Sequence, residues 1–213
     1  MTDDRRSVRS RNSKLAKRTA HWLARHHVKP NWISQASMVF AALAGIAFWR
    51  SGGDQALWLV LAALGIQARL LCNLLDGMVA LENARGARDG AFWNEAPDRV
   101  ADLLILVGAG MGAGATGVGW AAGAMAVLTA YVREHGTARG LRPDFSGPMA
   151  KPQRMAVMTG GALLATVLPV VLDLHTVTWA LWVVIVGTVL TIARRARRIV
   201  VTMRETPPPA GRS

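Results

Sequence analysis

The chain has 213 residues, 52% of them hydrophobic, and its 25 Lys and Arg outnumber its 13 Asp and Glu, which gives a formal net charge of +12. Its mean hydropathy is still positive, at +0.26, a combination typical of chains whose charges are segregated along the sequence. This composition argues against a soluble nucleic-acid-binding protein, and the single cysteine, Cys72, excludes an intrachain disulfide or a thiolate metal site.

Residues 1–29 are predicted to form a basic amphipathic segment. Nine Lys and Arg are spread through it, so it has no apolar stretch of the kind that a secretory signal needs. Leu15, Thr19, Trp22, Leu23 and His26 are spaced on one helical face. This spacing is typical of a helix that lies on anionic membrane lipids. A disordered basic tail is the alternative interpretation.

Long uncharged runs follow, at residues 31–49 and 103–132. A helix crosses the hydrocarbon layer with about 20 residues, and glycines divide the second run into two. We therefore predict an all-α integral membrane protein with six transmembrane helices, preceded by the amphipathic interfacial helix. The expected spans are 31–49, 55–75, 97–111, 118–132, 155–172 and 176–193. Residues 30–198 form one membrane domain in this interpretation, and 199–213 a C-terminal tail.

Basic residues alternate between the two sides of this arrangement. They gather at the amino terminus, in segments 81–96 and 133–154 and at 194–198, whereas the opposite loops hold only Arg50 among lysines and arginines. Cytoplasmic loops carry the excess of Lys and Arg. Both termini are therefore expected to be cytoplasmic, in an inner or plasma membrane.

Six of the 13 acidic residues lie between Asp76 and Asp102, where the second span ends and the third begins. Carboxylates at membrane depth mark functional sites by default. On helical spacing, Asn73, Asp76 and Ala80 share one face. Asn94, Asp98 and Asp102 share another, and antiparallel helices would bring the two faces together. Oxygen ligands without His or Cys favour Mg²⁺ or Mn²⁺ bound to a phosphorylated substrate.

Simpler interpretations of the charged residues remain open. The acids could merely balance nearby arginines in an ordinary cytoplasmic loop. Arg69 lies inside the second span, and a salt bridge to Asp102 would account for it. Basic residues before the fifth span could bind a lipid or alcohol phosphate, or could only reflect the positive-inside rule. These residues are Arg133, Arg139, Arg142, Lys151 and Arg154.

Residues 73–98, NLLDGMVALENARGARDGAFWNEAPD, resemble the signature of the CDP-alcohol phosphotransferases, a six-helix membrane family that synthesises phospholipids. The family pattern is Asp, two residues, Asp-Gly, two residues, Ala-Arg, about eight residues, Gly, three residues, Asp, three residues, Asp. The spacing fits without a gap, but Asn73 and Asn94 replace the first and third aspartates, and Leu81 replaces the arginine. KPNWIS at 29–34 and GPMAKPQRM at 147–155 are similar to two further family segments.

The resemblance implies roles for individual residues. Asp98 matches the family's catalytic base. The metal ligands would be Asp76, Asn73, Asn94 and Asp98, with Mg²⁺ or Mn²⁺ as cofactor. The substrate-binding residues would be Asn31, Gly77, Ala80, Gly90 and Lys151. Asn can ligate Mg²⁺ through its carbonyl oxygen, but two negative charges are lost.

The implied activity is transfer of a phosphatidyl or related phosphate group from a CDP-linked donor, such as CDP-diacylglycerol, to an alcohol acceptor, with release of CMP. The sequence does not name the acceptor. A nonenzymatic relative, serving as a nucleotide- or lipid-binding membrane subunit, is the alternative. A small transporter is disfavoured because the polar cluster lies at one membrane face. The resemblance also leaves a homodimer open.

Overall fold

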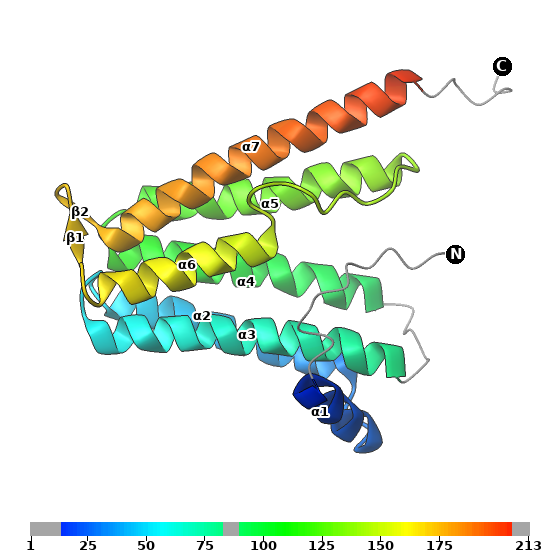
Figure 1. The fold of residues 1–213 in the computed structure, drawn as a ribbon, viewed down its shortest axis with the longest axis horizontal. Helices are drawn as coiled ribbons and strands as arrows, with labels where there is room; N and C mark the ends of the chain where they lie inside the picture. The colour runs from blue at the N-terminus through cyan, green and yellow to red at the C-terminus, as the bar shows by residue number, and fades with distance from the viewer. Residues whose placement is uncertain (1–13, 83–89, 206–213) are drawn as a thin grey trace, which may run out of the picture.

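The computed structural model describes residues 14–82 and 90–205, which form seven helices and one short β-hairpin (Figure 1). Side chains beside the gap, including that of Asn94, lie outside the described part. The elements are α1 (Lys14–Arg25), α2 (Pro30–Arg50), α3 (Ala56–Glu82), α4 (Gly90–Gly112), α5 (Thr116–Ala138), α6 (Lys151–Ala165), β1 (Val170–Val171), β2 (Leu174–His175) and α7 (Thr176–Glu205).

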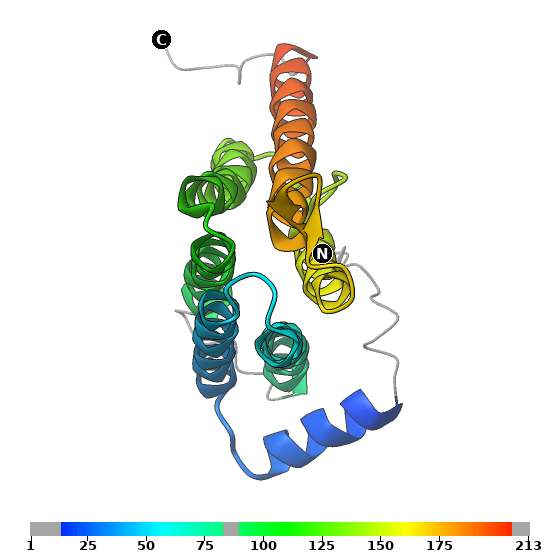
Figure 2. The same ribbon diagram turned by 90° about the vertical axis from the view of Figure 1, so that its left-hand side faces the viewer.

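Helices α2 to α7 lie side by side and alternate in direction, while α1 crosses one end of the bundle (Figures 1 and 2). Helix α2 packs against α3 and α4, α4 packs against α5, and α7 packs against α5 and α6. Helix α6 closes the arrangement by packing against α3. The start of α2 and the end of α7 therefore lie at the same end of the bundle.

Three of the described helices are long and apolar enough to cross a membrane: α2, α3 over Ala56–Ala80, and α7. Helix α6 has 15 residues and α4 begins with several charged residues, so neither qualifies on length and composition alone. Large apolar side chains are exposed along the outer surfaces of α2, α3 and α7, among them Leu43, Leu57 and Val186. Such a surface suits lipid rather than water, which fits a membrane protein.

The core is built largely from small side chains, which let the helix backbones approach one another closely. The closest approach is a glycine seam of Gly45 on α2 with Gly108 and Gly112 on α4. A methyl group added at Gly45 would overlap the carbonyl oxygen of Leu104, and one at Gly108 would overlap the backbone of Gly45. The seam fixes α4 against α2 and thereby positions the charged residues at the start of α4.

The ends of the last two predicted spans differ from the structure. Helix α6 ends at Ala165, and the expected span to Leu172 is wrong because Pro169 disfavours helix at and before it. The chain instead turns and pairs Val170 with His175 in the β1–β2 hairpin. Helix α7 continues to Glu205, past the expected end at 193 and into the segment expected as a tail.

Helix α1 confirms the expected amino-terminal helix but buries a different face. Its Ala16 and Ala20 are buried against the end of α3, because small alanines allow the two helices to approach closely. Leu23 is half-buried beside them, whereas Trp22 is 56% exposed and stacks on His26, with ring centroids 4.2 Å apart. The exposed tryptophan leaves an aromatic side chain facing outward at the end of the bundle.

Candidate active site

The polar faces predicted on α3 and α4 meet. Asn73 Nδ2 of α3 donates a hydrogen bond to Asp98 Oδ1 of α4 at 2.7 Å. Both helices pack on α2, so these two side chains reach across the space between α3 and α4. An ionised carboxylate only accepts hydrogen bonds, so the Asn73 amide nitrogen must face it. The expectation that the two faces meet is confirmed for this pair.

Asp98 is held by cationic side chains on both of its oxygens. Its Oδ2 forms an ion pair with Lys151 Nζ, at the first residue of α6. Arg69 Nη2 lies 3.4 Å from its Oδ1 and 3.3 Å from its backbone oxygen. The Asp98 side chain is 13% exposed. The structure thus buries most of this side chain among nitrogen donors from two other helices.

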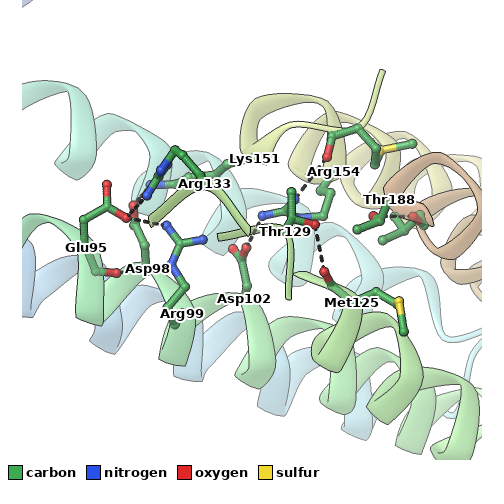
Figure 3. A network of polar contacts seen from close by, with 12 residues as sticks. Glu95, Asp98, Arg99, Asp102, Met125, Thr129, Arg133, Lys151, Arg154 and Thr188 are labelled. Atoms are coloured by element: carbon green, nitrogen blue, oxygen red, sulfur yellow. Dashed lines mark hydrogen bonds and ion pairs between the residues drawn. The ribbon is translucent and has the colours of Figure 1, made fainter. Parts of the chain in front are cut away.

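Asp102, one turn further into α4, is buried between Arg69 and Arg154, and Figure 3 shows Arg154 beside it. Its Oδ1 accepts a hydrogen bond from Arg69 Nη2 at 2.8 Å, and its Oδ2 accepts one from Arg154 Nη2 at 2.7 Å. The expected salt bridge between Arg69 and Asp102 is confirmed. Arg154 was one of the residues that could bind a phosphate. Because it is buried and bonded to Asp102, we assign it a structural role instead. We call Arg69, Asp98, Asp102, Lys151 and Arg154 the charged cluster.

Asp76 occupies a separate buried position between α3 and α2. Its Oδ2 accepts a hydrogen bond from Ser34 Oγ at 2.8 Å, while its Oδ1 is buried without a partner among the described residues. A buried carboxylate oxygen left unpaired is costly, so it is a candidate ligand atom. Ser34 was not predicted as a site residue, although it stands in the KPNWIS segment.

The remaining sequence-predicted residues fall in different places. Asn31 is half-buried in the first turn of α2, about one turn before Ser34. Gly77 is half-buried next to Asp76, whereas Ala80 is exposed. Gly90 opens α4, but its surroundings and the side chain of Asn94 lie outside the described residues.

The described residues fit a divalent cation poorly. They contain no group of three or more His, Cys, Asp or Glu side chains that could hold a metal ion. Asp98 already accepts from Asn73, Arg69 and Lys151, and Asn73 presents its donor group to Asp98. Asp76 Oδ1 is the unpaired carboxylate oxygen that remains in this part of the chain. Mg²⁺ prefers near-octahedral oxygen coordination, often through one or two carboxylates with water and phosphate.

A second group of charges connects the charged cluster to the neighbouring helix α5. Glu95, about one turn before Asp98, pairs with Arg99 at 2.8 Å and also with Arg133 of α5 (Figure 3). The Arg133 guanidinium lies over the ring of Phe145, 4.9 Å from its centroid. These contacts fix the direction of Arg133 and were not predicted from the sequence.

Arg133 borders a cavity of about 450 Å³ between α5, α7 and the segment that joins α5 to α6. The cavity is lined by Arg133, Gly136, Gly140, Leu141, Arg142, Asp144, Arg195, Arg198, Ile199 and Thr202. Four arginines and a single aspartate make it strongly basic, and we call it the basic cavity. Its size and charge suit a small anionic molecule.

Backbone and side-chain contacts hold this lining in place. Arg195 is buried and donates to the carbonyl oxygens of Ser146 and Thr129, both at 3.0 Å. Asp144 Oδ2 accepts from Arg198 Nη1 at 3.1 Å. Partial burial alone would raise the pKa of Asp144, but hydrogen bonds from Ser146 and Arg198 outweigh it and hold the pKa below its ordinary value.

No protein-family model matches the chain. The chain is 30% identical over 178 residues to phosphatidylinositol phosphate synthase of Mycobacteroides abscessus, an alignment that covers 77% of the chain and 72% of that relative. It is 31% identical over 93 residues to inner membrane protein YnbA of Escherichia coli, which is 44% of the chain and 45% of that relative.

The fold is similar to that of phosphatidylinositol phosphate synthase of Mycobacterium tuberculosis. The structure of that protein with CDP-DAG bound gives a TM-score of 0.74 at 19% identity, covering 94% of this chain and 99% of the other. Its complex with manganese and citrate gives the same TM-score and identity, covering 93% of both chains. At this identity the structural likeness shows the shared fold.

Proposed function

The chain belongs to the CDP-alcohol phosphatidyltransferase family, and from this membership we propose that it transfers a phosphatidyl or related phosphate group from a CDP-linked donor to an alcohol acceptor. CDP-diacylglycerol is the proposed donor, since the tuberculosis homologue was solved with CDP-DAG bound. The observation that carries the proposal is the position of Asp98. Its carboxylate pairs with Lys151, and Glu95, about one turn earlier on α4, pairs with Arg133 of the basic cavity.

In the proposed reaction the acceptor hydroxyl oxygen attacks the phosphorus that bears the diacylglycerol. The bond from that phosphorus to the bridging oxygen breaks, and CMP leaves with this oxygen. The hydroxyl proton passes to the Asp98 carboxylate, which acts as general base. Such a transfer depends mainly on in-line positioning and on neutralising phosphate charge. Lys151 supplies positive charge at Asp98, and Arg133 supplies it about one turn earlier, at Glu95.

The basic cavity supports a phosphorylated acceptor. Arginines recognise phosphate with paired donors, and a lining of four arginines and one aspartate favours an anionic acceptor over an uncharged alcohol. The name of the Mycobacteroides relative, phosphatidylinositol phosphate synthase, is consistent with such an acceptor. We therefore place the acceptor's phosphate among Arg133, Arg142 and Arg195, with its hydroxyl directed toward Asp98.

We also propose that all six helices α2 to α7 cross the membrane, with both termini and the candidate active site on the cytoplasmic side of an inner membrane. The concentration of arginines at this end supports that orientation. The relative named as an inner membrane protein is consistent with the location.

The test is CMP release from CDP-diacylglycerol by the purified protein in lipid nanodiscs. Inositol phosphate and glycerol phosphate are compared with inositol, glycerol and serine as acceptors, and Asp98→Asn is the control variant. We expect CMP release with phosphorylated acceptors and its loss in the variant. Release that is equal in the variant would remove Asp98 as the base, and release only with uncharged alcohols would contradict the role of the basic cavity.

Two features favour a second candidate, an inactive family member that binds nucleotide or lipid. Asn73 and Asn94 stand where the signature has aspartates, and the Asp98 carboxylate is engaged by Lys151. Such a protein would bind CDP in the same assay but release no CMP with any acceptor.

A further inference from the structure

We propose that the Lys151 ammonium takes the place of a divalent cation at the diphosphate of the CDP-linked donor, so that this chain binds its donor without metal. This inference rests on the proposed function, because it assigns the charge that holds the donor of that reaction. Three observations support it: the charges missing from the signature, the contacts of Asp98, and the balance of charge in the cluster.

The first observation is the loss of acidic ligands. Asn73 and Asn94 remove two negative charges from the four signature positions. Neutral carbonyl oxygens hold a hard divalent cation more weakly than carboxylates do, since the affinity of such sites depends on the number of charged ligands. The replacement therefore weakens metal binding at the two positions where it occurs.

The second observation is that a cation already engages one of the two remaining signature carboxylates. Lys151 Nζ pairs with Asp98 Oδ2, and Asn73 Nδ2 donates to Asp98 Oδ1 at 2.7 Å. A metal ion bound by Asp98 would share the carboxylate with these donors and lie next to the Lys151 charge. Asp76 Oδ1 is unpaired, but it offers one oxygen, so a divalent ion there would take most of its ligands from water and phosphate.

The third observation is the charge balance of the described side chains. The charged cluster holds three cations, Arg69, Lys151 and Arg154, and two carboxylates, Asp98 and Asp102, so its net charge is +1. A divalent cation would add two further positive charges beside Lys151, which Coulomb repulsion opposes. A diphosphate brings the negative charge that this cluster lacks.

Lys151 has the freedom that this role requires. Its side chain is 23% exposed, unlike the buried Arg69 and Arg154, and its flexible stem carries three donors. It is the first residue of α6, where the helix dipole disfavours a cation unless an anion compensates. Asp98 provides that anion in the free protein. A diphosphate would provide it in the complex, where Lys151 turns to the phosphate oxygens and frees Asp98 Oδ2 to accept the acceptor's proton.

The experiment measures CDP binding to the full-length protein in nanodiscs by calorimetry, in EDTA and in Mg²⁺ or Mn²⁺. The variants are Lys151→Met, the charge-conserving Lys151→Arg, and Lys17→Met as a matched control on the exposed side of α1. Cytidine, which lacks the diphosphate, is the control ligand. Thermal unfolding of each variant verifies that it is folded, and CMP release is measured in parallel.

We expect the wild-type affinity for CDP in EDTA to lie within about twofold of that in Mg²⁺, and Lys151→Met to weaken it at least about tenfold in both, the loss typical of a charged hydrogen bond. Lys151→Arg and Lys17→Met should bind as the wild type does. Cytidine should not distinguish Lys151→Met from the wild type.

Two results overturn the inference: an EDTA-induced loss of about tenfold or more in wild-type affinity for CDP, or an unchanged affinity in Lys151→Met. The proposed function fails separately. If CDP binds without metal and through Lys151 but no CMP is released, the transferase proposal fails and the charge assignment stands. If CDP does not bind under any condition, both fail.

Discussion

The glycine seam and the charged cluster hold the same helix, α4, by opposite means. At the seam, α4 lies against α2 with no side chain between Gly45 and Gly108, so the contact depends on the absence of atoms. About two turns earlier, Asp102 holds α4 to α3 and α6 through Arg69 and Arg154. The seam depends on volume and tolerates no added methyl group, whereas the cluster depends on charge.

This difference assigns the two regions different tasks. Close backbone packing stabilises a membrane helix pair, since lipid offers no competing attraction between small residues. Buried ion pairs add little net stability, but they fix the geometry of the side chains. Removing one partner destabilises the fold, because it leaves the other charge buried and unpaired. The seam therefore determines where α4 lies, and the cluster determines which chemical groups its first turns present.

The largest effect is expected in the charged cluster, on activity. Asp98→Asn removes the proposed base and should lower CMP release by about 10²–10⁴-fold, the usual contribution of a general base. The variant keeps the size of the side chain but leaves Lys151 without its carboxylate, so the fold should be retained with a modest fall in melting temperature. Asp54→Asn, in an exposed loop at the opposite end, is the control. Turnover within about tenfold of the wild type would exclude Asp98 as the base.

The next largest effect is on stability. Asp102→Ala leaves the buried guanidinium groups of Arg69 and Arg154 without their shared carboxylate, and should cost about 3–5 kcal/mol of unfolding free energy. Denaturant unfolding in mixed micelles measures it. Replacing all three residues by Met, Leu and Met should recover most of this loss, because no buried charge then remains. A triple variant as unstable as Asp102→Ala would show that the ion pairs themselves stabilise the fold.

Substitutions in the glycine seam should change the stability of the fold through side-chain volume alone. Gly108→Ala places a methyl group against the backbone of Gly45 and should cost about 1–3 kcal/mol of stability. Gly160→Ala is the matched control, because no atom lies near its added methyl group, and it should stabilise helix α6 by about 0.5–1 kcal/mol. Equal effects of the two substitutions on the melting temperature would contradict the close packing of α2 and α4.

A smaller effect is expected in the basic cavity. Arg142 is an exposed part of its lining, so Arg142→Ala should raise the KM for a phosphorylated acceptor by about three- to tenfold with little change in kcat. Arg50→Ala, exposed at the opposite end of the bundle, is the control. A fall in kcat with an unchanged KM would remove Arg142 from acceptor binding.

The smallest effect concerns Asp144, whose carboxyl pKa lies below its ordinary value of 3.8. A carboxyl with a lowered pKa in the folded state stabilises the fold above its ordinary pKa, and this contribution is lost as the pH falls through the lowered value. Asp144→Asn should therefore melt slightly below the wild type at neutral pH. The difference should vanish in acid, and a difference that persists below the lowered pKa would contradict the assignment.

Local pattern was sufficient to predict the helices and part of the site. The uncharged run at 31–49 predicts α2 nearly to its ends, because a hydrophobic helix needs little else to form in a membrane. The pairing of Arg69 with Asp102 was predictable because a buried arginine requires a carboxylate. Pro169 indicated that the helix should end before it. The apolar residues on both sides of the proline nevertheless favoured a continuous span in the sequence-based prediction.

Other contacts depend on tertiary structure that no local pattern encodes. Asp98 pairs with Lys151, and Glu95 pairs with Arg133, across different helices and long stretches of sequence. These pairings follow from the order in which α4, α5 and α6 pack. Spacing could nominate Asp98 as a functional residue, but it could not show that a lysine engages the same carboxylate.

The length of α7 sets the depth at which the proposed chemistry would occur. Its 30 residues span about 45 Å at 1.5 Å per residue, whereas the hydrocarbon layer is about 30 Å thick. With Thr176 at one boundary of that layer, Arg195 and Arg198 reach the other, and the final turns extend beyond it. The basic cavity then lies at the level of the lipid headgroups. A water-soluble acceptor and a membrane-anchored donor can meet there without either leaving its own phase.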